Sequence, residues 1–114
     1  MIKMMALLTR KSHLTHAQFV DHWLNIHGPL ALAVPGVRRY VQSHIVGTQS
    51  RPDIPDTDVE IDGFAELWYD DMESAKRAGA TPEMKTLTDD GALFIGRIKS
   101  YAIDEKQIIP PLAG

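Results

Sequence analysis

Hydrophobic and polar positions in the first part of the chain follow two different periods. Residues 2–9, IKMMALLT, form a short apolar run that ends at Arg10, which is typical of a strand beginning close to the N-terminus. Phe19, Trp23 and Ile26 then recur at helical spacing and form one apolar stripe. The pattern predicts a strand followed by an amphipathic helix.

The two ends of this helix carry signals of their own. Thr15 stands three residues before Gln18, the capping-box spacing at which a hydroxyl and an amide satisfy backbone donors at a helix start. Gly28 and Pro29 interrupt the stripe, because glycine suits a left-handed cap and proline cannot continue the hydrogen-bond ladder. We therefore predict that the helix ends at Gly28, with His27 at its C-terminal end.

Strict alternation of side chains replaces the helical spacing in two later segments. Residues 37–46, VRRYVQSHIV, and residues 63–69, GFAELWY, both alternate with a period of two, which predicts strands. Residues 47–62 between them hold two prolines and a cluster of acidic side chains, which is typical of a long surface loop.

The last part of the chain predicts an interrupted helical region and a fourth strand. Helix starts are indicated at Asp70 and at Thr81, with a stop at Gly79 between them and a second stop at Gly91. Residues 94–104, FIGRIKSYAID, form the strand. The order is β-α-β-β-α-β with a split second helix, an α+β class and a ferredoxin-like fold.

This order leaves one face of a four-stranded antiparallel sheet without helices. Ala65 and Leu67 are small or aliphatic and suit contact with the helices, so we place Phe64, Glu66 and Trp68 on the open face. Large aromatic side chains on that face would form an exposed apolar patch in a monomer. We therefore expect a homodimer formed through the open face.

Composition and charge narrow the class of protein. The 114 residues, 44% apolar and 24% charged, suit one globular domain over residues 1–114. A formal charge of −3 with scattered basic residues gives no patch for nucleic acid, and no apolar run approaches the length that spans a membrane. The chain has no cysteine and thus no sign of an oxidising compartment. We expect a cytoplasmic protein that binds neither nucleic acid nor membranes.

Four stretches resemble the EthD-like family of the dimeric α+β barrel superfamily. They are FVDHWLNIHGPLA at 19–31, PGVRRYVQSH at 35–44, DGFAELWYDD at 62–71 and FIGRIKSYAI at 94–103. The resemblance implies a homodimer in which each sheet half-closes a barrel, with a small-molecule pocket between the sheet and the end of the first helix. The closing strands are also similar to those of methylmuconolactone methylisomerases, related enzymes of aromatic catabolism, whose pocket histidine and tyrosine would correspond to His27 and Tyr40.

His27, Tyr40 and Glu66 are the candidate catalytic residues. At a helix C-terminus the pKa of His27 would be raised, so His27 would act as acid or base near neutral pH, unless it only caps helix carbonyls. Tyr40 would orient a substrate oxygen, or else meet the dimer partner. A carboxylate between two aromatic residues would have a raised pKa, so Glu66 would tune or relay the proton, unless it pairs with Arg38 or Arg39.

Candidate substrate-binding residues come from both later strands. They are Gln42 and His44, which share a strand face with Tyr40, and Phe64 and Trp68 on the open sheet face. A strand face this polar requires partners inside a folded chain, such as a cavity that holds water or a ligand.

No cofactor and no metal are expected. His22 and His27 lie five residues apart, which turns them to different sides of a helix, and no metal or nucleotide motif occurs. The leading hypothesis is a cofactor-independent isomerase or lyase that moves a proton on a cyclic, mostly apolar, catabolic or polyketide-type intermediate such as a lactone. Two alternatives stay open: a non-catalytic accessory protein that binds a reactive oxygenase product, and a haem protein using His27 or His44.

Overall fold

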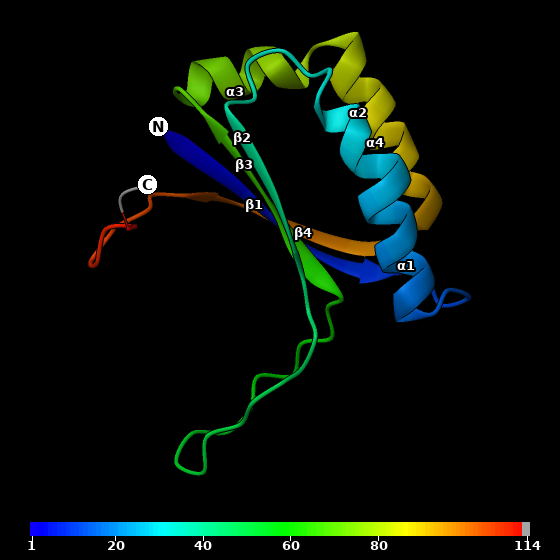
Figure 1. The fold of residues 1–114 in the computed structure, drawn as a ribbon, viewed down its shortest axis with the longest axis vertical. Helices are drawn as coiled ribbons and strands as arrows, with labels where there is room; N and C mark the ends of the chain where they lie inside the picture. Colours follow the sequence, from blue (N-terminus) through cyan, green and yellow to red (C-terminus); the bar gives the residue numbers. More distant parts are fainter. Residues whose placement is uncertain (113–114) are drawn as a thin grey trace.

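A four-stranded antiparallel sheet forms the centre of the computed structural model, which describes residues 1–112. The strands are β1 (Ile2–Arg10), β2 (Arg39–His44), β3 (Gly63–Tyr69) and β4 (Ile95–Ile103), in the spatial order β2-β3-β1-β4. The helices cover one face of this sheet (Figure 1). The predicted α+β, ferredoxin-like architecture is confirmed.

The helical elements fall into two groups on that face. The first comprises α1 (His16–His22), a π-helical turn η1 (Trp23–His27) and α2 (Gly28–Ala31), and the second comprises α3 (Met72–Gly79) and α4 (Pro82–Phe94). No helix within residues 1–112 is both long enough and apolar enough to cross a membrane.

The first helix begins where the sequence predicted but continues past its predicted end. The capping box is present, since Thr15 Oγ1 accepts from the Gln18 amide and the Gln18 side chain accepts from the Thr15 amide. The stop predicted at Gly28 is wrong, because the Gly28 amide donates to the Trp23 carbonyl five residues earlier. Such a turn is wider than an α-helical turn and accommodates Pro29, which has no amide hydrogen and would clash with a carbonyl in a regular helix.

Alternation assigned the faces of β3 correctly. Ala65 and Tyr69 are buried toward the helices, and Leu67 packs against the same core. Phe64 and Trp68 lie on the opposite face and are half-buried. The period of two along a strand therefore separates the helix-covered face from the open one.

The core beneath the helices is built around three aromatic residues. Phe19, Trp23 and Phe94 are fully buried, with the Phe19 ring centroid 5.4 Å from that of Trp23 and 5.1 Å from that of Phe94. Burying one such side chain contributes about 2–3 kcal/mol. Ile26, predicted to belong to this stripe, is 52% exposed, and the neighbouring His27 is buried instead.

The second helical region is split as predicted, with two changes at its boundaries. α3 ends at Gly79, and Thr81 caps α4 by accepting from a backbone amide. The cap of α3 is Asp71 rather than Asp70. The end predicted at Gly91 is wrong, since α4 continues to Phe94, whose side chain enters the core.

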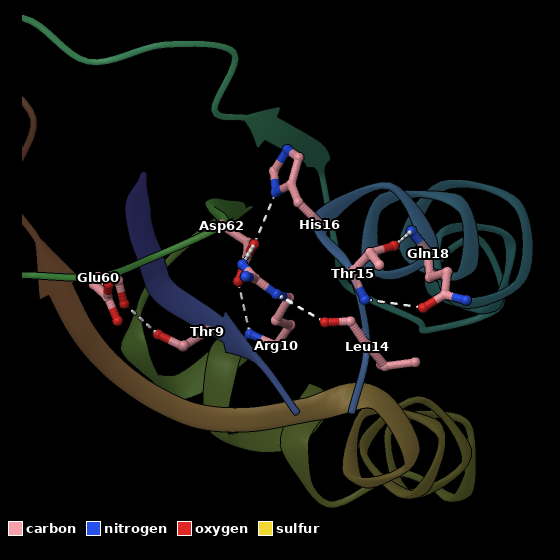
Figure 2. A network of polar contacts seen from close by, with 8 residues as sticks. All are labelled: Thr9, Arg10, Leu14, Thr15, His16, Gln18, Glu60 and Asp62. Atoms are coloured by element: carbon pink, nitrogen blue, oxygen red, sulfur yellow. Dashed lines mark hydrogen bonds and ion pairs between the residues drawn. The ribbon is translucent and has the colours of Figure 1, made fainter. Parts of the chain in front are cut away.

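The loop after β2 extends away from the sheet (Figure 1) and is held at its base by Asp62. The Asp62 carboxylate, 2% exposed, accepts from the backbone and guanidinium of Arg10 and contacts Nδ1 of His16 at 2.7 Å (Figure 2). Burial alone would raise the pKa of Asp62, but the hydrogen bonds from Arg10 and His16 together lower it. This network ties the loop to β1 and α1.

Candidate functional site

An apolar cavity of about 340 Å³ lies between the helices and the helix-covered face of the sheet. Its wall includes Ala6, Leu8, Ala65 and Leu67 from the sheet and Leu87 and Gly91 from α4. His27 and Tyr40 also line it, so the structure brings these two predicted residues to one cavity. Among the described residues, none of those lining the cavity is a lysine, arginine, aspartate or glutamate. Polar chemistry in the cavity therefore depends on a small number of groups.

The π-helical turn brings His22 and His27 to the same carboxylate. Nδ1 of His27 lies 2.8 Å from Asp90 Oδ2, and Nε2 of His22 lies 3.1 Å from the same oxygen. The prediction that these histidines face different sides of the helix is wrong, because it assumed a regular α-helix rather than a turn with bonds between residues five apart. Within residues 1–112, no group of three or more histidine, cysteine, aspartate or glutamate side chains is arranged to hold a metal ion.

The contact between His27 and Asp90 fixes which ring nitrogen of His27 carries the proton. A carboxylate can only accept, so the contact with Asp90 places the imidazole proton on Nδ1. Nε2 then carries the lone pair, and it has no hydrogen-bond partner within the part of the chain that the structure describes. Burial lowers the pKa of His27, and the opposing effect of Asp90 does not restore it. The predicted rise of this pKa is wrong, because the helix does not end at His27 and the side chain is only 10% exposed.

Tyr40 is the second polar residue in the wall of the same cavity. It projects from β2 toward the helices, and its oxygen accepts a hydrogen bond of 3.0 Å from Gln42 Nε2. Burial raises the pKa of Tyr40, opposed by the hydrogen bond from Gln42 and by the nearby indole of Trp23. The indole nitrogen is buried and makes no well-formed hydrogen bond to any described residue. Tyr40 therefore remains a neutral hydroxyl at ordinary pH.

Gln42 and His44 lie behind this wall and do not line the cavity. Gln42 Nε2 donates to the Trp23 carbonyl at 2.8 Å, and Gln42 Oε1 lies 2.8 Å from Nε2 of His44. The His44 ring packs against Trp23 with centroids 4.8 Å apart. The polar strand face is thus satisfied by protein groups, and the geometry does not support the predicted direct contact of either residue with a substrate.

Glu66 lies on the other side of the sheet from His27 and Tyr40, and so do Phe64 and Trp68. The predicted grouping of Glu66 with His27 and Tyr40 does not occur within the chain, because neighbouring strand residues alternate between faces. A catalytic role for Glu66 in this cavity has no geometric support.

The partner of Glu66 also differs from the expected arginines. Glu66 Oε2 lies 2.7 Å from Lys3 Nζ, which also contacts Glu105 at 2.8 Å. The hydrogen bonds to these two carboxylates raise the pKa of Lys3, and the one to Glu105 has the larger effect. Arg39 instead stacks over Trp68, with its guanidinium carbon 4.6 Å from the ring centroid.

A second, polar depression of about 790 Å³ lies at the base of the long loop. Its wall includes Arg10, Asp62, Glu60 and Arg97. Asp62 is already engaged by Arg10 and His16 in the anchoring network (Figure 2). We therefore assign the candidate site to the apolar cavity, where Nε2 of His27 and the hydroxyl hydrogen of Tyr40 have no partner among the described residues.

Sequence reasoning missed Asp90. It lies 63 residues from His27 along the chain, next to the similar but exposed Asp89. Only the docking of α4 beside the π-helical turn distinguishes the two aspartates. Helical phase offered a weak signal, since Leu87, Asp90 and Phe94 recur at spacings of three and four and share one side of α4.

Comparison with known proteins places the chain in a family. The model of the EthD domain matches residues 11–98. A crystal structure of an ethyl tert-butyl ether D (EthD) family protein from Bacillus halodurans superimposes with a TM-score of 0.75 at 29% identity, covering 93% of this chain and 99% of that one. No curated protein matches the sequence significantly.

Two more distant structures share the fold. A dimeric ferredoxin-like protein of unknown function from Thermobifida fusca has a TM-score of 0.69 at 14% identity, covering 90% of this chain and 88% of its own. SnoaB, a cofactor-independent oxygenase from Streptomyces nogalater, has a TM-score of 0.61 at 15% identity, and the match covers 96% of this chain and 97% of SnoaB. With its family match over most of its length and its ferredoxin-like sheet, the chain belongs to the EthD family.

Proposed function

We propose that this protein is a cofactor-independent enzyme that moves a proton on an uncharged, cyclic, mostly apolar carbonyl compound, as an isomerase or lyase. The observation that carries the proposal is the 2.8 Å contact between His27 Nδ1 and Asp90, which leaves the Nε2 lone pair of a buried ring in the wall of an apolar cavity. Tyr40, whose hydroxyl is neutral, lines the same cavity.

The proposed reaction begins with proton transfer to His27. The Nε2 lone pair takes a proton from the carbon next to the carbonyl, the C–H electron pair forms a C=C bond, and the carbonyl π electrons move to oxygen. Tyr40 donates a hydrogen bond to that oxygen, and Asp90 stabilises the imidazolium. His27 then returns the proton to another carbon in an isomerisation, or to a leaving group in an elimination. A positioned base of this kind accelerates proton transfer by about 10²–10⁴.

The lining of the cavity favours an uncharged substrate. A volume of about 340 Å³ suits a small ring compound and lies near the lower end for ligand pockets. A carboxylate bound there would find no cationic side chain among the described lining residues, and an unpaired charge in apolar surroundings is strongly unfavourable. Neutral ketones and lactones are therefore better candidates than lactones that carry an acid group.

The test is hydrogen–deuterium exchange of 2-tetralone, an enolisable bicyclic ketone, followed in D₂O by proton NMR. We expect the protein to accelerate loss of the signals next to the carbonyl, and His27→Gln to reduce that acceleration about 10²–10⁴-fold. His13→Gln, which changes an exposed histidine, is the matched control. A correctly folded His27→Gln variant with wild-type exchange would contradict the proposal.

The same assay separates the enzyme from an accessory binding protein. The apolar lining alone would suit a protein that sequesters an oxygenase product, and such a protein would bind 2-tetralone without accelerating exchange. For a haem role, Nε2 of His44 is already engaged by Gln42. Nε2 of His27 has no such partner, so His27 is the histidine that this role would need. Addition of haem, with the Soret region recorded, tests that role directly.

We propose further that two copies of the chain pair through the open sheet face. Phe64 and Trp68 lie there half-buried, and the Thermobifida protein with the same fold is dimeric. Light scattering should give a dimer for the wild type and a smaller species for Trp68→Glu, because a carboxylate would be buried between the sheets. An unchanged mass for a folded Trp68→Glu would contradict this arrangement.

A further inference from the structure

We infer that the cavity selects ligands that place an acceptor oxygen beside Tyr40, because Gln42 and His44 leave the Tyr40 hydroxyl proton no orientation except toward the cavity. This inference rests on the proposed function in that it concerns the same site, and it adds the feature by which a substrate is recognised. Gln42 and His44 act here as positioning residues.

The chain of hydrogen bonds begins at the carbonyl of Trp23 in the π-helical turn. This oxygen accepts from the amide of Gly28 and from Gln42 Nε2 at 2.8 Å. A carbonyl cannot donate, so the Gln42 side chain must present its nitrogen to it. A Cβ at position 28 would lie 3.0 Å from Gln42 Nε2, so glycine leaves the room that this contact needs.

The far end of the Gln42 amide is held by His44. Gln42 Oε1 can only accept, so the 2.8 Å contact requires that His44 Nε2 carry the proton. Rotating the amide by half a turn would set Oε1 against the Trp23 carbonyl, and two acceptors would then face each other. The Trp23 end therefore fixes the orientation of the amide, and His44 matches it with the tautomer that carries the proton on Nε2.

The orientation of Gln42 determines what Tyr40 can do. The second hydrogen on Gln42 Nε2 points to the Tyr40 oxygen at 3.0 Å, so this oxygen accepts. The indole N–H of Trp23 is near enough to lower the pKa of Tyr40 but makes no well-formed hydrogen bond to a described residue. Residues 1–112 offer no acceptor for the Tyr40 hydroxyl hydrogen, and Tyr40 lines the cavity. The hydrogen is thus available to a ligand.

The two polar groups in the cavity wall consequently have opposite character. Tyr40 donates, and Nε2 of His27 accepts. A carbonyl compound with an acidic C–H matches both, because its oxygen accepts and its carbon-bound hydrogen faces the base. A hydrocarbon of the same shape satisfies neither group, and the cost of leaving a buried donor unpaired then opposes binding.

The experiment compares two ligands that differ in one oxygen, 2-tetralone and tetralin, by calorimetry. We expect the wild type to prefer 2-tetralone by about threefold to tenfold, the usual range for one neutral hydrogen bond. With carbonyl-labelled ¹³C 2-tetralone, the bound carbonyl signal should move downfield, as it does when a carbonyl accepts a hydrogen bond. Tyr40→Phe should abolish both the preference and the shift.

Two substitutions of Gln42 test its positioning role. Gln42→Glu offers Tyr40 an acceptor inside the protein, so the carbonyl shift should be lost although Tyr40 is retained. Gln42→Met keeps the volume but frees the hydroxyl to rotate, so the shift should fall without disappearing; it also serves if Gln42→Glu fails to fold. Ser43→Ala, next in sequence but on the open face, is the control and should leave the shift unchanged.

Three results would overturn the inference: equal affinity for tetralin and 2-tetralone, failure of both to bind, or a wild-type carbonyl shift in Tyr40→Phe or in both Gln42 variants. The proposed function fails separately. A shifted carbonyl without hydrogen–deuterium exchange would support the inference and reject the proton-transfer enzyme. If exchange depends on His27 but the carbonyl shift is the same with and without the Tyr40 hydroxyl, the proton-transfer enzyme is supported and the inference is rejected.

Discussion

Replacing Asp90 by asparagine tests the imidazole–carboxylate pair without changing its size. Asp90 contacts His27 Nδ1 at 2.8 Å and His22 Nε2 at 3.1 Å. An asparagine can direct its amide hydrogens at Nδ1 of His27, which moves the ring proton to Nε2 and removes the lone pair from the cavity. The variant should therefore fold and still lose most of its ability to take a proton from a ligand.

The size of the effect follows from the burial of the pair. The side chains of His27 and Asp90 are 10% and 12% exposed, so solvent screens their contact less than that of a surface pair. A hydrogen bond to a charged group contributes about 1.5–3 kcal/mol, and an asparagine that keeps part of it should lower the free energy of unfolding by about 1–2 kcal/mol. Loss of the productive tautomer should lower the exchange rate by about 10²–10⁴-fold.

The assay measures 2-tetralone exchange and urea unfolding in Asp90→Asn and in Asp89→Asn. The control removes the same charge from the adjacent position, where Asp89 is 64% exposed and contacts only Lys85 at 2.8 Å within the described chain. Asp89→Asn should exchange at the wild-type rate. Equal exchange rates in the two variants, with both folded, would refute the assignment of Asp90 as the group that orients His27.

Three further predictions concern pH, packing and the open face. Burial lowers the pKa of His27 from its ordinary 6.5, so the exchange rate should reach half its maximum below pH 6.5. The unfolded chain binds this proton more readily, so the free energy of unfolding should fall as the pH drops from 6.5 through the pKa of His27 in the folded chain. A midpoint of the exchange-rate profile above pH 6.5 would contradict the lowered pKa. Gly63→Ala should lower the free energy of unfolding, measured in urea, by more than about 3 kcal/mol, because the added Cβ would lie 2.3 Å from the Ser43 carbonyl oxygen. A loss below about 1 kcal/mol would count against this close approach. Glu66→Gln should leave exchange within about twofold of wild type, since Glu66 pairs with Lys3 on the opposite face, and a large loss of exchange would return Glu66 to the site.

Local sequence signals predicted much of the fold. The capping box at Thr15 and Gln18 and the alternation of residues 63–69 appear in the structure as predicted. Each depends on atoms only a few residues apart, so the interactions that create the element lie within the segment that predicts it. The meeting of His27 and Tyr40 at one cavity was also predicted, through the family resemblance.

The chemistry of the site depended on contacts that the sequence does not order. A regular helix was the natural prediction around Pro29, yet a π-helical turn turns His22 and His27 toward one carboxylate. Burial, a property of the whole packed chain, reversed the predicted direction of the His27 pKa. The role of Gln42 likewise depends on a backbone carbonyl 19 residues away.

The sequence by itself therefore determined the order of the elements, the faces of the strands and the family of the chain, because periodicity and capping act over short stretches. Only the tertiary structure decided that Asp90 orients His27 and that Glu66 faces away from both His27 and Tyr40. Proton positions and pKa values depend on which groups meet across distant segments and on how much water is excluded when they do. Those quantities exist only in the folded chain.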